Sequence, residues 1–293
     1  MKNKIFIIGF VMFFILQTAL VFGQAAGTPG LAYQSTNQGN EYTVRAGTVT
    51  SGAVVIPAFH NNRPVTAIAP GGFKNLRGIT SVTIGNNVIR INVNAFQGCS
   101  NLERVTIGNS VVRIEQNAFE GAGLTTVTIP DSVEVLGTHV FKNNSNLTTV
   151  TFGSRVTVIP TNAFENCRDL TTVNIGGGVH TISTNAFAGC TRLTRVNFGN
   201  NSRVATIGMS AFARCTNLAA ITIPASVTSI GANAFNGCTS LTSVTIQGLI
   251  TSGNFNRSAF PGDLREKYLI ADERAGGRGT YNRPLGSNTW LKR

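Results

Sequence analysis

Residues Leu102–Ala122 read LERVTIGNSVVRIEQNAFEGA, and residues Leu170–Cys190 read LTTVNIGGGVHTISTNAFAGC. The two segments carry the same letters at their leucine, valine, isoleucine and asparagine-alanine-phenylalanine positions. The shared pattern is L-x-x-V-T-I, followed by V-x-x-I, then N-A-F and finally G-C. Self-similarity of this kind at a fixed interval is the sequence signature of a repeat architecture.

The phenylalanine of the pattern marks its register along the chain. The intervals between successive copies are 23 residues in most cases, 22 in one and 25 in two. The nine copies are Phe73, Phe96, Phe119, Phe141, Phe164, Phe187, Phe212, Phe235 and Phe260. A register held over so many copies predicts a stack of coils, with one coil for each repeat.

Each repeat position has a physical reason. L-x-x-V-T-I alternates apolar and polar residues, which predicts a short strand with one face in the core. V-x-x-I predicts a second apolar segment on the opposite wall of the coil. The residue before A-F, such as Asn117 or Asn185, is expected to cap a single helical turn. The residue closing that turn is Gly or Asn, as at Gly98 and Asn166, which accept the left-handed conformation. Arg214 is the exception.

These features predict the fold class: an α/β solenoid, mostly β, built as a leucine-rich-repeat stack of about nine coils of roughly 23 residues with N- and C-terminal caps. A stack needs caps because open ends expose core and sheet edge. The predicted domains are a signal peptide at 1–23, an N-terminal linker and cap hairpin at 24–52, the solenoid at 53–260 and a C-terminal cap at 261–293.

The first residues predict export. Lys2 and Lys4 precede the apolar run Ile5–Phe22, and small or polar residues follow from Gly23. This is the layout of a secretory signal peptide, with cleavage expected after Gly23. An uncleaved membrane anchor is the alternative, because about 18 apolar residues just span a bilayer. The expected location is secreted or at the cell surface or outer envelope.

The repeat, the entry coil IPAFHNNRPVTAI (Ile56–Ile68) and the exit segment PGDLREKYL…GTY (Pro261–Tyr281) resemble the BspA-like, or treponemal-type, leucine-rich-repeat proteins of bacterial surfaces. The resemblance covers roughly residues 33–285. It implies a secreted or surface-exposed protein that binds other proteins, with an adhesin-like role toward host matrix or another cell.

The sequence offers little for catalysis. None of the common hydrolase, metalloprotease or phosphate-loop motifs is present, so we expect no enzyme, catalytic residue, cofactor or metal site. The five cysteines share one repeat position, and we interpret them as free buried thiols, with a disulfide ladder or metal site as the alternative. They are Cys99, Cys167, Cys190, Cys215 and Cys238.

The expected partner is a protein, held by the strand face of the solenoid. The third and fifth positions of each strand point away from the core. The candidate residues are Arg104, Thr106, Thr126, Thr128, Thr149, Thr151, Thr172, Asn174, Arg195 and Asn197. The formal charge of +12 leaves a binder of anionic carbohydrate or envelope glycan as the alternative, or a structural envelope component. Export argues against a nucleic-acid partner, and after signal cleavage we expect no transmembrane domain.

Overall fold

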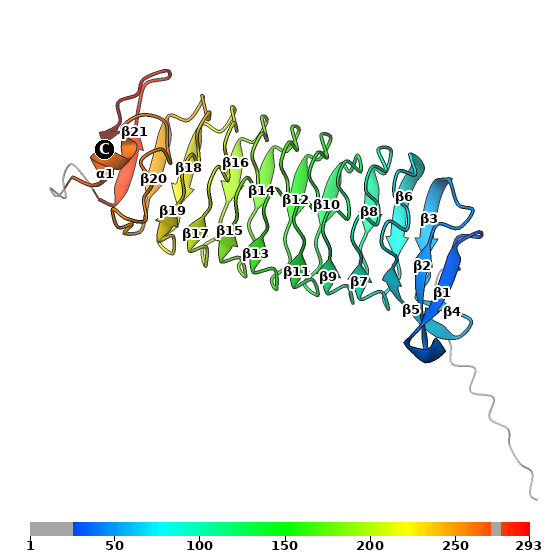
Figure 1. Ribbon diagram of the computed structural model, residues 1–293. Coiled ribbons are helices and arrows are strands. Elements are labelled where there is room, and N and C mark those ends of the chain that lie inside the picture. Colours follow the sequence, from blue (N-terminus) through cyan, green and yellow to red (C-terminus); the bar gives the residue numbers. More distant parts are fainter. Residues whose placement is uncertain (1–25, 271–276) are drawn as a thin grey trace, which may run out of the picture.

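The chain folds as a rod of stacked coils with a cap at each end (Figure 1). The computed structural model describes residues 26–270 and 277–293. The predicted signal peptide at 1–23 lies outside these described residues. The stack is mostly β and has about nine turns, as the repeat predicted, and the only α-helix in the described ranges is a single short one.

One wall of the rod, which we call the strand face, is formed by the L-x-x-V-T-I segments. Its strands pair in parallel and fall into three successive sheets. The first sheet contains β3 (Ser51–Ile56), β6 (Gly78–Ile84) and β8 (Arg104–Thr106). The second contains β10 (Thr126–Thr128), β12 (Thr149–Thr151), β14 (Thr172–Asn174) and β16 (Arg195–Asn197). The third begins with β18 (Ala220–Ile223) and β20 (Ser243–Ile246).

The opposite wall is formed largely by the V-x-x-I segments, as expected. Each contributes a two-residue parallel strand whose isoleucine or leucine is buried. One sheet contains β7 (Arg90–Ile91), β9 (Arg113–Ile114) and β11 (Val135–Leu136). The next contains β13 (Val158–Ile159), β15 (Thr181–Ile182), β17 (Thr206–Ile207) and β19 (Ser229–Ile230).

The core between the two walls is a continuous column of phenylalanine rings. From Phe73 to Phe260, neighbouring ring centroids lie 4.5–5.5 Å apart with interplanar angles of at most 18°. Every ring from Phe73 to Phe235 is completely buried. Because each ring packs on the coils before and after it, no coil is stable alone, which is the expected property of a solenoid.

The prediction of a capped helical turn is wrong. Asn117 and Asn185 have positive φ angles of 56° and 55°, whereas a helix N-cap is normally extended. Asn117 uses its side chain instead to donate a hydrogen bond of 3.0 Å to Asn94 of the preceding coil. The residues that follow form turns rather than an α-helix. Asparagine is favoured because it tolerates the left-handed conformation and also ties adjacent coils together.

The N-terminal cap is an antiparallel hairpin of β1 (Ala32–Thr36) and β2 (Glu41–Arg45), joined by the 3-10 turn η1 (Asn37–Gly39). β2 pairs with β5 (Arg63–Ile68), which continues the second wall. The enlarged entry coil is a second hairpin of β4 (Phe59–His60) with β5. The hairpins therefore close the first end of the stack.

The C-terminal cap contains α1 (Leu264–Tyr268). β21 (Gly279–Asn282) then pairs antiparallel with β20 and with β22 (Leu291–Lys292). Trp290 is buried, and its indole N–H donates to the carbonyl of Pro261 at 2.8 Å. Trp290 thus belongs to the C-terminal end of the core and is held by Pro261, the residue that follows the last phenylalanine of the column.

Candidate binding surface

Side-chain alternation along the strands places the ten candidate residues on the outside of the strand face. The central residue of each three-residue strand points into the core, as Val127 and Val150 do. The flanking residues are exposed or half-buried. A flat polar surface follows directly from the L-x-x-V-T-I pattern.

Register brings eight of the ten candidates into one sheet. Along β10, β12, β14 and β16 the third repeat position forms the row Thr126, Thr149, Thr172 and Arg195. The fifth position forms the parallel row Thr128, Thr151, Asn174 and Asn197. Arg104 and Thr106 belong to β8, which pairs with β6 instead. Within the described residues no strand pairing joins β8 to β10, so Arg104 and Thr106 extend the surface beyond an interruption of the sheet.

The hydroxyl groups of this surface differ from those at its border. Thr125, Thr148 and Thr171, one position before the strands, donate hydrogen bonds to carbonyl groups of the preceding coil. In the described part of the chain, the outward threonines on β10, β12 and β14 make no such bonds. Their hydroxyls are thus available to a partner, since the side-chain hydrogen bonds between coils are made by Thr125, Thr148 and Thr171 instead.

The two arginines are the only charged candidates. Arg104 and Arg195 are exposed, and no ion pair among the described residues involves either. They lie four coils apart, roughly 19 Å at the usual strand spacing. Asn197, beside Arg195, donates a hydrogen bond of 2.7 Å to Asn174. The surface therefore offers a cation near each end and neutral polar groups between them.

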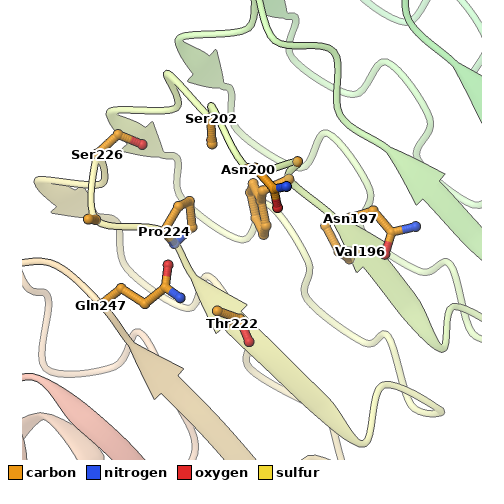
Figure 2. A pocket seen from close by; sticks show the side chains of 11 residues that line it. Val196, Asn197, Asn200, Ser202, Thr222, Pro224, Ser226 and Gln247 are labelled. Atoms are coloured by element: carbon orange, nitrogen blue, oxygen red, sulfur yellow. The ribbon is translucent and has the colours of Figure 1, made fainter.

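A groove that the sequence did not reveal borders this surface (Figure 2). It has a volume of about 640 Å³ and lies where the sheet is interrupted between β16 and β18. Asn197, Asn200 and Ser202 line one side, with Thr222 and Gln247 opposite, and none of its lining residues is charged. Asn200 and Ser202 come from the extra residues behind the first 25-residue interval, which is the signal that could have located the groove.

The cysteines are placed as free, buried thiols. Each S–H donates to the carbonyl of a phenylalanine one coil earlier, as Cys167 does to Phe141 at 3.3 Å. Burial raises the pKa of Cys99 to about 11 and the pKa of Cys167 to about 12. These thiols therefore stay protonated and unreactive at neutral pH. Residues 26–270 and 277–293 contain no group of three or more histidine, cysteine or acidic side chains arranged to hold a metal ion.

The repeat matches a family model described as the BspA type leucine rich repeat region, with six copies over residues 66–194 and 157–263. These matches span more than half of the chain. The protein belongs to the BspA-type leucine-rich-repeat family. No curated protein matches its sequence. Repeat scaffolds of the BspA type are typically non-enzymatic, and leucine-rich-repeat proteins in general bind other proteins.

Solved structures agree with this membership. The chain is similar to a Treponema pallidum leucine-rich-repeat protein, TpLRR, with 26% identity, a TM-score of 0.61 and coverage of 66% of this chain and 91% of that one. A Bacteroides ovatus leucine-rich-repeat protein shares the fold at 23% identity and a TM-score of 0.54, covering 80% of this chain and 66% of that one. Among the described residues of this BspA-type chain, no helix is long and apolar enough to cross a membrane.

Proposed function

We propose that this BspA-type protein is exported and works as an adhesin-like module, which binds a protein of host matrix or of another cell through its strand face. The observation that carries the proposal is the row of outward threonine hydroxyls that make no hydrogen bond to another described residue. Arg104 and Arg195 stand near its ends, without an ion pair in the same part of the chain. A partner laid across the coils would meet donors and acceptors in register, at little conformational cost to this rigid surface.

Arginine is the natural anchor of such an interface. Its planar guanidinium makes several directed hydrogen bonds, and arginine is enriched among the residues that carry most binding energy. The neutral groove beside Asn197 gives the surface a hollow along the strand face. We assign it as a place for an uncharged side chain of the partner.

The test is a binding assay of the mature chain against a panel of purified extracellular-matrix proteins and whole bacterial cells. Replacing Arg104 and Arg195 together by Ala should weaken binding about tenfold or more, as expected for two interface anchors. The free energy of unfolding should change by less than about 1 kcal/mol, because both side chains are exposed.

Arg90→Ala is the matched control. Arg90 is 51% exposed and lies on the opposite wall in β7, so its loss removes one positive charge, against two in the double variant, without touching the strand face. Equal binding by the double variant and the wild-type chain would refute the strand-face assignment. An equal loss in the Arg90→Ala control would show that net charge, rather than this surface, governs binding.

A further inference from the structure

A second column of residues runs along the coils, at the position that closes the turn after each phenylalanine. Its members all have positive φ, between 60° and 74°. They are Asn75, Gly98, Gly121, Asn143, Asn166, Gly189, Arg214 and Gly237. Glycine and asparagine accept this left-handed conformation, whereas a long side chain pays a steric cost for it. Arg214, with φ of 61°, is therefore a residue that the fold alone would not select.

Arg214 borders a hollow on the turn side of the rod. The hollow has a volume of about 520 Å³ and is lined by Asn166, Arg168, Gly189, Thr191 and Arg214. Gly189 has no side chain to fill the space between the coils that carry the two arginines. A Cβ atom at Gly189 would lie only 2.5 Å from the side-chain oxygen of Asn166. Both guanidinium-bearing side chains are exposed at the border of this hollow.

The charges around the hollow are unbalanced. No ion pair in the described part of the chain involves Arg168 or Arg214. The acid next to Arg168 is Asp169, and it pairs with Arg192 at 3.2 Å. Arg168, Arg192 and Arg214 thus stand on three successive coils whose two carboxylates, Glu165 and Asp169, pair with Lys142 and Arg192 and leave Arg168 and Arg214 without a counter-charge. Unpaired arginines facing one hollow are the arrangement that recognises an oxyanion.

We propose that this hollow binds an oxyanion group, sulfate or carboxylate, carried by an acidic polysaccharide. Arg168 and Arg214 would donate charge-assisted hydrogen bonds to the oxyanion. Thr191, on the coil between theirs, also lines the hollow, and its hydroxyl donates to the carbonyl of Arg168. A polysaccharide is favoured over a small ion because the hollow is open and the arginines follow one another coil by coil. A chain crossing the hollow meets Arg168 on one coil and Arg214 two coils further on. This site is separate from the strand face and independent of a protein partner there.

The decisive variant is Arg214→Gly, because glycine is the residue that neighbouring coils carry at the same position. The substitution removes the charge and also relieves the strained backbone, so it separates binding from folding. If Arg214 stabilised the fold, Arg214→Gly would lower the melting temperature of the protein. Arg214→Gly should instead melt at or above the wild-type temperature while losing affinity for the polysaccharide.

The experiment measures binding of the mature chain to heparin, hyaluronan and neutral dextran at low and raised salt. We expect heparin or hyaluronan to bind, more weakly at raised salt, and dextran not to bind. Arg214→Gly and Arg168→Ala should each weaken the interaction about tenfold, the loss of one charge-assisted hydrogen bond. Preference for heparin assigns a sulfate ligand, and preference for hyaluronan assigns a carboxylate.

Arg90→Ala is again the control for net charge, and it should bind like the wild-type chain. The proposal is overturned if Arg214→Gly and Arg168→Ala bind heparin and hyaluronan as well as wild type does, or if Arg90→Ala loses as much affinity as they do. It is also overturned if inorganic sulfate binds at this site while neither polysaccharide does. The strand-face variant at Arg104 and Arg195 should leave this binding intact, which keeps the two proposals distinguishable.

Discussion

Phe164→Ala tests the central claim that the phenylalanine column holds the coils together. The Phe164 ring is completely buried. Its centroid lies 5.3 Å from those of both Phe141 and Phe187, in stacked geometry. Phe152 adds an edge contact at 5.6 Å. The substitution therefore removes three aromatic contacts and leaves a cavity at the centre of the rod.

The expected cost follows from these contacts. Phenylalanine-to-alanine changes in protein cores destabilise by about 3–5 kcal/mol. The upper end applies at Phe164, because each lost aromatic pair is worth roughly 0.5–1.5 kcal/mol beyond burial. Collapse of the cavity is opposed by the backbone, since the N–H of Phe164 is bonded to the carbonyl of Ala186 at 2.8 Å. We expect a loss of about 5 kcal/mol, with neighbouring coils loosened on both sides.

The assay is guanidinium unfolding monitored by circular dichroism, together with amide hydrogen exchange. Phe73→Ala is the matched control, because Phe73 is also fully buried but, among the described residues, stacks on a single ring, that of Phe96 at 5.0 Å. It should cost less than Phe164→Ala, and exchange should rise only near the N-terminal cap. An unchanged midpoint for Phe164→Ala, or faster exchange confined to its own coil, would refute the stacked-column explanation.

Two further predictions concern the cysteine column. Asn144 occupies the cysteine position in its coil and is fully buried. Its side chain donates hydrogen bonds to the carbonyls of Phe119 and Phe141 and accepts one from the N–H of Leu124. Asn144→Ala should lower the free energy of unfolding in urea by about 1–3 kcal/mol, because the buried N–H of Leu124 loses its acceptor. Raising the pH from 7.5 to 10 should lower the melting temperature, because burial raises the pKa of Cys99 from 9.0 to about 11. The folded protein therefore holds the thiol proton more tightly than the unfolded chain does, and the stability that this difference contributes is complete below about pH 9 and is lost toward pH 11. The expected loss is about 1.4 kcal/mol for the Cys99 thiol at pH 10, and a variant with Cys99 changed to Ala, the residue already present at Ala122, should lose correspondingly less.

Most of the fold could be predicted from the sequence because one pattern fixes it repeatedly. The alternation in L-x-x-V-T-I determines which side chains enter the core, and the phenylalanine register determines that the coils stack. The error at Asn117 and its equivalents arose because asparagine suits both a helix cap and the left-handed conformation. The choice between them depends on a hydrogen bond to Asn94 of the preceding coil, and the sequence of a single repeat does not contain that contact.

The interruptions of the strand face could not be predicted from the strand pattern, although the repeat length contains the signal. β8 and β10 begin 22 residues apart, at Arg104 and Thr126, and β16 and β18 begin 25 apart, at Arg195 and Ala220. Both intervals depart from 23, and at both the ladder is broken. A coil of different length cannot keep every backbone group opposite its partner. The groove beside Asn197 lies at the second interruption, between β16 and β18, so its position depends on the length of the repeat rather than on the type of residue.

Because the repeat is so regular, residues that depart from it are informative. A departure that makes hydrogen bonds or ion pairs inside the protein has a structural explanation, whereas one without such partners points to a function. Asn144 breaks the cysteine column, yet three hydrogen bonds inside the fold account for it, one of them to the N–H of Leu124 in the short coil. Arg214 breaks the glycine and asparagine column and has no ion pair among the described residues to account for it. An exception that costs conformational energy and gains nothing inside the protein must be explained by something outside it. By that criterion we propose the turn side at Arg214, as well as the strand face, as a binding surface.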